Sequence, residues 1–187
     1  MDQLVRIAAR SSRLFAWLGG FLLLGVAVLI TFEVITRKFF GFSMSGADEI
    51  SGYVLAIVTA WTFSYCVTSR SNIRIDVVYH VMPDRLRALA DVIGLFVLAV
   101  FATFLALRGA QVLLVSIEYG SRSVTTLSTP LWIPQLGWAS GLVFFAIVVW
   151  TYLLRCAALL LRRQTSEVGK LAGIGSVIPT RGDRSKR

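Results

Sequence analysis

The side chains able to bind ions or partners lie at the edges of long apolar runs. Glu33 and Arg37 are four residues apart, which places them on one helical face with the acid on the favourable N-terminal side. Two interpretations are open. The residues form a local ion pair at the end of a helix, which contributes little when it is exposed, or they bridge to another helix or subunit. Arg108 is a candidate partner for such a bridge. Asp48 and Glu49 directly precede the next apolar run. They either complement the positive end of the helix dipole or form an acidic surface that a partner contacts.

A second group of polar residues lies in the segment 70–83, which is too apolar for a free loop. Its apolar residues recur at helical spacing and predict a short helix in the membrane interface, ended by Pro83. The candidate contact residues of this segment are Asn72, Arg74 and Asp76. The single histidine, His80, is better explained as a polar tip at the interface than as a metal ligand or proton relay.

The residue patterns that catalysis or cofactor binding requires are not found. Cys66 and Cys156 form no CxxC motif or Cys/His cluster, and one histidine cannot provide a bis-His haem site. Coupled transport usually needs an ionisable group well inside the membrane. Only the third apolar run contains charges, Asp91 and Arg108, and both lie near its ends. The sequence therefore predicts a non-enzymatic protein without cofactors that does not transport alone.

The composition indicates a membrane protein. Of the 187 residues, 56% are hydrophobic and 16% charged, compared with about 25% charged in soluble domains. The net charge of +9 would suit a nucleic-acid-binding protein, but such proteins are rarely this apolar. Four stretches are long enough to cross a bilayer, so we predict an all-α integral membrane protein without nucleic-acid partners. The predicted spans cover residues 14–33, 50–69, 88–110 and 132–155.

The basic residues predict the orientation of these spans. With the N-terminus inside, 15 of the 19 Lys and Arg residues face the cytoplasm, as the positive-inside rule requires. Both termini are therefore predicted to be cytoplasmic, and the first span is expected to be retained rather than cleaved as a signal peptide. Residues 1–163 form the predicted membrane domain, and residues 164–187 a disordered basic tail.

The connection before the last span is rich in hydroxyl groups and includes Pro130. The chain returns to the membrane at Trp132, which fits an aromatic belt or a docking contact. Small residues recur four apart on one face of the second span and of the fourth, and such faces allow close helix packing. They serve contacts within the protein or with another protein, and the residues are Gly52, Ala56, Ala60, Gly137 and Gly141.

The order of these features resembles the small permease subunit of tripartite ATP-independent periplasmic (TRAP) transporters, the DctQ-like family. The shared features run from about residue 33 to 141: Glu33 with Arg37, Asp48-Glu49, the segment 70–76 followed by Pro83, Gly120-Ser-Arg-Ser, and Pro130-Leu-Trp-Ile-Pro134. One departure is Asn72, where the family often has histidine. The neighbouring Ile73 and Asp76 are in place.

The resemblance implies a function in the bacterial inner membrane. In such symport systems a periplasmic protein captures an organic acid, of the carboxylate or sialic-acid type, and delivers it to the membrane complex. The large permease subunit holds the substrate and ion sites, with sodium the expected ion, and the small subunit braces it. Glu33 and Arg37 would then stabilise the outer end or the subunit junction. Asp48, Glu49 and residues 120–130 would face the binding protein, and residues 72–76 would belong to a horizontal cytoplasmic helix.

Three other classes of protein stay open. A stand-alone four-helix carrier, as a homodimer, would show flux from the purified chain alone. A membrane anchor of a respiratory enzyme would bind haem or quinone and usually needs additional histidines. A structural membrane protein without a transport partner would co-purify without a large permease subunit.

Overall fold

The computed structural model describes residues 2–41, 46–69, 83–125, 127–161 and 171. Four helices make up most of this part of the chain: α1 (Asp2–Phe40), α2 (Ala47–Thr68), α4 (Asp84–Glu118) and α5 (Trp132–Leu161). All four are long and apolar enough to span a membrane, so the predicted number of spans is confirmed. The predicted interfacial helix and nearly all of the predicted tail lie outside the described residues.

The helices begin and end where the local sequence favours it. Asp48 and Glu49 lie in the first turn of α2, where acids complement the positive end of the helix dipole. The residue before α4 is Pro83, which has an extended backbone and cannot extend the helix backwards. Gly41 and Gly120 follow α1 and α4 with positive φ angles of 64° and 56°. Glycine adopts that conformation without steric cost, so the chain can turn there.

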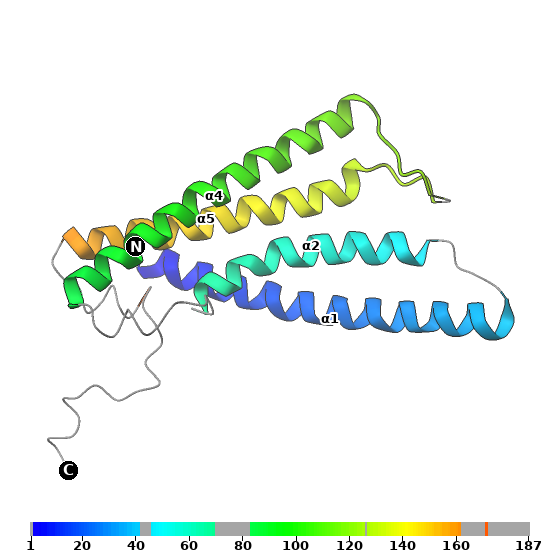
Figure 1. The fold of residues 1–187 in the computed structure, drawn as a ribbon, viewed down its shortest axis with the longest axis horizontal. Helices are drawn as coiled ribbons and strands as arrows, with labels where there is room; N and C mark the ends of the chain where they lie inside the picture. Colours follow the sequence, from blue (N-terminus) through cyan, green and yellow to red (C-terminus); the bar gives the residue numbers. More distant parts are fainter. Residues whose placement is uncertain (1, 42–45, 70–82, 126, 162–170, 172–187) are drawn as a thin grey trace, which may run out of the picture.

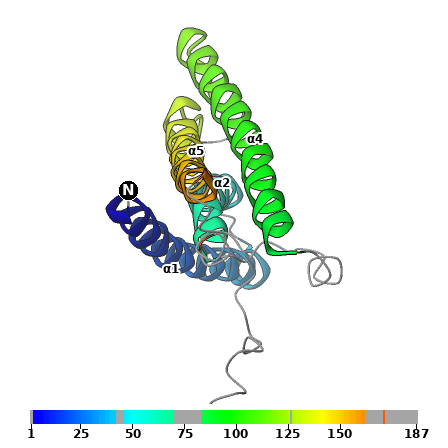
Figure 2. The same ribbon diagram turned by 90° about the vertical axis from the view of Figure 1, so that its left-hand side faces the viewer.

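The helices are arranged as a row, in the order α1, α2, α5, α4 (Figure 1). Helix α5 packs between α2 and α4, and α1 packs along α2 with a smaller contact to α5. The view turned by 90°, roughly along the helices, shows α1 and α4 on opposite sides of the central pair α2 and α5 (Figure 2). One end of the row contains the C-terminal end of α1, the N-terminal ends of α2 and α5, and the α4–α5 connection. We call it the loop end. The opposite end is the terminal end.

Burial increases from the edges of the row towards α5. In the most apolar stretch of each helix, 50% of α5 is buried inside the protein but only 11% of α1. Three aromatic rings from three helices meet in the middle, and their centroids lie 4.2 to 5.5 Å apart: Phe15 of α1, Trp61 of α2 and Phe144 of α5. The two edge helices therefore leave most of their apolar surface uncovered.

Small residues bring α2 and α5 together. A Cβ atom built on Gly137 would lie 2.9 Å from Cδ1 of Ile57, and one on Gly141 would lie 2.9 Å from Cβ of Ala60. The indole nitrogen of Trp61 donates a hydrogen bond of 2.9 Å to the backbone oxygen of Gly137. The small-residue stripe of the fourth span thus serves packing within the protein. Gly52 of α2 differs, because its Cβ position has open space around it.

The central position of α5 predicts different reactivities for the two thiols. Cys66 of α2 is exposed and Cys156 of α5 is buried. In the detergent-purified subunit, N-ethylmaleimide is expected to modify Cys66 quickly and Cys156 only after SDS unfolding. Cys66→Ser should abolish fast labelling, and Cys156→Ser should leave it unchanged, as read by intact mass. Equal labelling of both thiols in the folded subunit would contradict the burial of α5.

Candidate functional site

The connection between α4 and α5 folds back on itself at the loop end. The backbone N–H of Ser123 donates to the oxygen of Thr129 over 2.9 Å, and the N–H of Leu131 donates to the oxygen of Ser121 over 3.0 Å. Arg122 and Pro130 form an isolated antiparallel bridge between these two bonds. These contacts give the connection a defined shape, although its described residues form no named strand.

Glu49 ties this connection to α2. The hydroxyl of Tyr53, one turn further along α2, donates to Oε1 of Glu49 over 2.5 Å. The hydroxyl of Thr125, in the α4–α5 connection, donates to the other carboxylate oxygen, Oε2. Hydrogen bonds to a charged acceptor are stronger than those between neutral groups. The carboxylate therefore uses one oxygen within its own helix and the other to hold the connection.

An apolar contact lies beside these hydrogen bonds. The side chain of Leu127 lies directly over Gly46, at the start of α2, in the space that a Cβ atom there would occupy. Glycine allows this close approach because it has no side chain. The connection is thus held on α2 by one polar and one apolar contact. We call Glu49, Tyr53, Thr125, Leu127 and Gly46 the latch.

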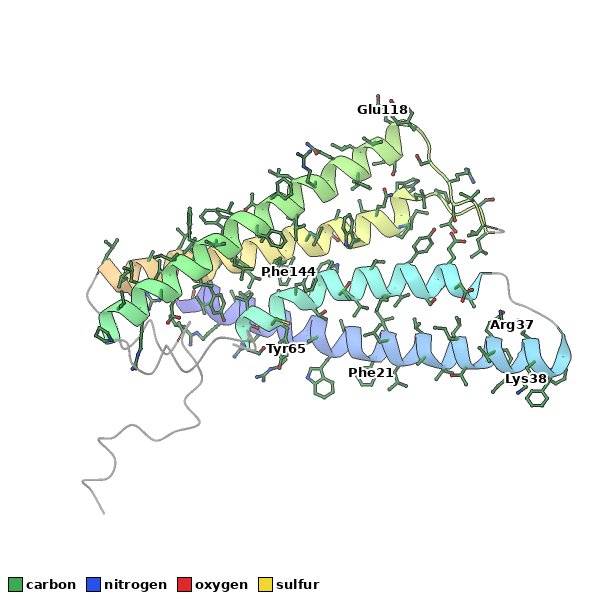
Figure 3. The ribbon with its side chains drawn as sticks, viewed as in Figure 1. Phe21, Arg37, Lys38, Tyr65, Glu118 and Phe144 are labelled. Atoms are coloured by element: carbon green, nitrogen blue, oxygen red, sulfur yellow. The ribbon has the colours of Figure 1, made fainter. Side chains whose placement is uncertain are left out.

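Glu33 and Arg37 differ in their exposure. Glu33 is only 6% exposed and lies on the same face of α1 as Gly19, whose Cβ position would meet Val58 of α2. This face is the one that packs against α2. Arg37 is exposed near the end of α1, where Figure 3 shows it with Lys38. Glu33 therefore belongs to the junction of the two helices and Arg37 to the surface of the loop end.

The other predicted site residues at the loop end are exposed or half-buried. Asp48 is exposed in the first turn of α2, and Pro130 is half-buried in the α4–α5 connection. Trp132 is the first residue of α5 and is 43% exposed. Asn72, Arg74 and Asp76 are outside the described residues.

Arg108 contacts its own helix. Its Nη1 donates a hydrogen bond of 2.9 Å to Oε1 of Gln111, and its guanidinium carbon lies 5.2 Å from the ring centre of Phe104. Helix α4 forms one edge of the row and α1 the other (Figure 2). The contacts described for Arg108 lie within α4 and do not include Glu33, for which Arg108 was a candidate partner.

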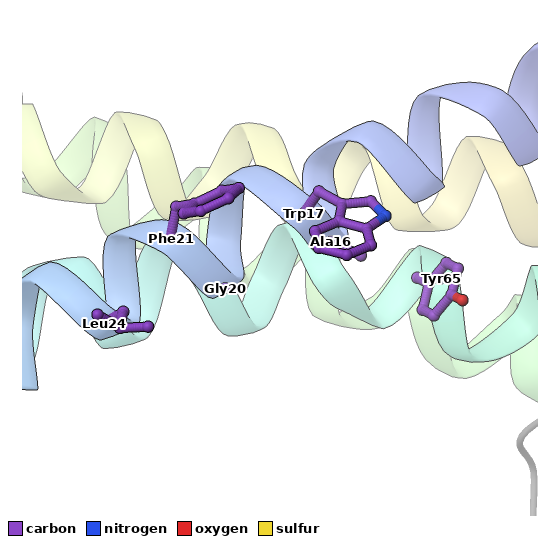
Figure 4. Close-up of a pocket in the computed structure, with 6 residues that line it drawn as sticks. All are labelled: Ala16, Trp17, Gly20, Phe21, Leu24 and Tyr65. Carbon is purple, nitrogen blue, oxygen red and sulfur yellow. The ribbon is translucent and has the colours of Figure 1, made fainter.

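Shallow grooves follow the edge helices. One, of about 420 Å3, runs along α1 and is lined by Ala16, Trp17, Gly20, Phe21, Leu24 and Tyr65 (Figure 4). Another, of about 460 Å3, lies between α4 and α5. The described residues contain no group of three or more His, Cys, Asp or Glu side chains placed to hold a metal ion.

Sequence reasoning found Glu49 but missed most of the latch. Tyr53 could have been identified, because it stands four residues after Glu49 on the same helical face. Thr125 lies 76 residues away in the sequence. No local pattern distinguishes it from the other hydroxyl residues of the connection.

The comparisons with known proteins identify the family. The description "Tripartite ATP-independent periplasmic transporters, DctQ component" belongs to the family that matches residues 26–162, from the middle of α1 to the end of α5. No curated protein and no solved structure matches the chain significantly. The match includes α2, α4, α5 and the latch. This membrane protein belongs to the DctQ family, the small membrane subunits of TRAP transporters.

Proposed function

We propose that this subunit braces the large permease of a TRAP transporter and presents a docking surface to the periplasmic substrate-binding protein. The observation that carries this proposal is the open row of helices. Its two edge helices leave most of their apolar surface uncovered. A row of this kind can lie along a larger membrane protein, because wide apolar faces stay available after the row has formed its own core.

In this proposal the loop end faces the periplasm and both chain termini face the cytoplasm. The distribution of Lys and Arg along the sequence supports this orientation in a bacterial inner membrane. The same orientation puts Arg37, Lys38 and Arg122 on the periplasmic side, together with Asp48 and Glu118. The periplasmic surface therefore carries charges of both signs, which can steer an encounter with a charged partner.

The latch supports the docking part of the proposal. A binding protein that visits the membrane complex repeatedly pays less to bind when the receiving surface is already ordered. Glu49 and Leu127 hold the α4–α5 connection in one place on α2. This leaves Asp48 and Arg122 exposed beside the latch as candidate contacts with the binding protein.

The transported substrate is proposed to be an organic acid, of the carboxylate or sialic-acid type. The family membership supports this class. The substrate site and the coupling-ion site, with sodium the expected ion, are proposed to lie in the large subunit. The chain described here would position that subunit without binding either species.

Co-purification from native membranes tests the proposed function. The full-length chain, tagged at its C-terminus, is extracted in mild detergent, and the proteins that elute with it are identified by mass spectrometry. We expect a stoichiometric partner with many membrane spans. We also expect uptake of an organic acid by the reconstituted complex to require both subunits and the binding protein.

A different result would support one of the alternatives. If the chain elutes alone or only with copies of itself, under conditions that preserve other membrane complexes, the bracing function is wrong. Flux from the purified chain alone would then favour the homodimeric carrier. A haem absorption spectrum in the eluate would favour the respiratory anchor.

A further inference from the structure

The groove on α1, shown in Figure 4, begins directly below two arginines on the same helix face. Counted from Arg13, the lining residues Trp17, Gly20 and Leu24 follow four, seven and eleven positions later. Arg10 stands three positions before Arg13 and seven before Trp17. These spacings place all five residues on one face of the helix. Both arginines are exposed, so two positive charges lie at the terminal-end mouth of the groove.

This face of α1 is not the one that packs against α2. Ser12 and Gly19 are buried and seven positions apart, and a Cβ atom at Gly19 would meet Val58 of α2. Arg13 and Gly20 each come one residue later, which turns them about 100° around the helix from that contact. The arginines and the groove therefore face the surroundings of the helix row together.

The aromatic side chains of the groove have their polar atoms at the same end as the arginines. Figure 4 shows the indole nitrogen of Trp17 and the hydroxyl of Tyr65 on the sides of their rings that point away from Leu24. Tyr65 lies in the last turn of α2, at the terminal end of the row. Trp and Tyr rings with this direction are typical of the boundary between hydrocarbon and headgroups. The mouth of the groove therefore lies at headgroup level.

The groove has the length and shape to receive an acyl chain. Arg13 to Leu24 corresponds to about 16 Å along a helix, roughly half of a hydrocarbon layer of about 30 Å. Two bulky rings line it, Trp17 and Phe21, which are 66% and 69% exposed with centroids 6.3 Å apart. Nothing lies within 4 Å of the Cβ position of Gly20 beside them. Membrane helices pack best on faces of small residues, whereas a flexible acyl chain can follow the space beside such rings.

The charges of α1 and α2 around the mouth have one sign. Helix α1 has no acidic residue between Asp2 and Glu33, and α2 has none after Glu49. A zwitterionic headgroup would bring its own ammonium group towards the two arginines. An anionic headgroup brings net negative charge, and basic clusters at the ends of membrane helices recognise such lipids.

We propose that the α1 groove binds an anionic phospholipid, with the phosphate at Arg10 and Arg13 and one acyl chain along Trp17 and Phe21. Phosphatidylglycerol has this chemistry, a phosphodiester without a compensating positive charge. A lipid here leaves the α4 edge of the row to the large subunit. The inference therefore goes beyond the proposed function and does not depend on it.

Photo-crosslinking with lipids tests the site. The full-length chain, with the proteins that co-purify with it, is placed in phosphatidylcholine nanodiscs that contain a small fraction of phosphatidylglycerol with a diazirine in its acyl chain. We expect adducts on residues 16–24, located by mass spectrometry of the peptides. Phosphatidylcholine with the same photoreactive chain should label these residues at least about fivefold less, because it lacks the net charge.

Replacement of the arginines tests the headgroup contact. Arg10→Gln and Arg13→Gln should each lower the phosphatidylglycerol adduct about fivefold, since each removes one charge at the membrane surface. The double variant keeps Arg6 and the basic residues of the other predicted cytoplasmic segments, so the orientation of the chain should not change. The matched control is Lys38→Gln, which removes an exposed charge at the other end of α1 and should leave the adduct unchanged.

Filling the groove tests the acyl-chain contact without altering any charge. Gly20→Leu puts a side chain into the open space of the lining and should lower the adduct. Gly25→Leu adds the same side chain to α1 at a position that is also open but outside the lining, and it should label as the original chain does.

Three results would overturn the inference. Equal labelling of residues 16–24 by the two headgroups would show that lipids contact the groove without selection. Unchanged labelling in the double arginine variant would show that the charges bind no headgroup there. A benzoylphenylalanine at Phe21 that captures the large subunit would assign the groove to protein. A chain that co-purifies with no large subunit can be labelled in the same way, so the lipid site and the proposed function stand or fail separately.

Discussion

Replacing Gly141 by Leu is expected to force α2 away from α5 and to leave little folded subunit. A Cβ atom at Gly141 would lie 2.6 Å from Cδ1 of Trp61, 2.9 Å from Cβ of Ala60 and 3.0 Å from the backbone nitrogen of Trp61. The backbone atom cannot move away by a change of rotamer, so the helices themselves must shift. Overpacking typically costs about 1–3 kcal/mol, and we expect the upper end of that range here because one of the neighbours is a backbone atom.

The separation would also break other contacts of the central pair. The indole nitrogen of Trp61 donates to the backbone oxygen of Gly137, and the Trp61 ring stacks on Phe144 of α5. A shift of α2 away from α5 therefore loses this hydrogen bond and the Trp61–Phe144 ring contact together with the helix packing. The measurement is the midpoint of SDS-induced unfolding of the purified subunit, followed by circular dichroism.

Gly25→Leu provides the matched control for Gly141→Leu. Gly25 is also a helical glycine in the membrane domain, but nothing lies within 4 Å of its Cβ position. We expect its unfolding midpoint to stay close to that of the original chain. If Gly141→Leu unfolded at the same midpoint as Gly25→Leu, the close packing of α2 on α5 would be wrong.

The fold could be predicted from the sequence to the level of the helices but not their arrangement. Four apolar runs of bilayer length predict four helices, because backbone groups in lipid must be satisfied within each segment. Which helices pack together depends on side chains far apart in the sequence. The stripe that contains Gly137 and Gly141 did indicate a packing face, but an identical spacing includes Gly52, whose Cβ position has open space around it. Spacing shows that an approach is sterically allowed and does not show where it occurs.

The candidate site, too, could be predicted from the sequence only in part. Glu49 could be identified as a candidate because a carboxylate at a helix start is chemically distinctive. Its bond to Thr125 depends on how the α4–α5 connection folds over α2. The positive φ of Ser128, 47°, is equally unreadable from the sequence, since serine adopts it only where surrounding contacts compensate. The latch is therefore a tertiary feature, although each of its residues is ordinary by itself.

Glu49→Ala is expected to raise the concentration of binding protein needed for half-maximal uptake. The substitution removes the acceptor for both Thr125 and Tyr53, so the α4–α5 connection must be ordered each time the binding protein docks. We expect a rise of about fivefold, from the loss of a charge-assisted hydrogen bond. The maximal rate at saturating binding protein should stay the same, because the large subunit carries out transport in the proposed function. Uptake into proteoliposomes that contain the full complex measures both quantities.

A double-mutant cycle separates the latch from direct docking by Glu49. If Glu49 acts by holding Thr125, then Thr125→Val should raise the half-maximal concentration by a similar factor. The double variant should be no worse than the poorer single variant, because both changes break the same bond. Additive effects would instead show that Glu49 contacts the binding protein itself. Hydrogen exchange gives a second readout. The backbone amides of Ser123 and Leu131 donate hydrogen bonds within the α4–α5 connection, so they should exchange faster once the connection is no longer held on α2.

Faster exchange together with non-additive effects on uptake would show that Glu49 positions the connection. Exposed neighbours such as Asp48 would then be the residues that contact the binding protein.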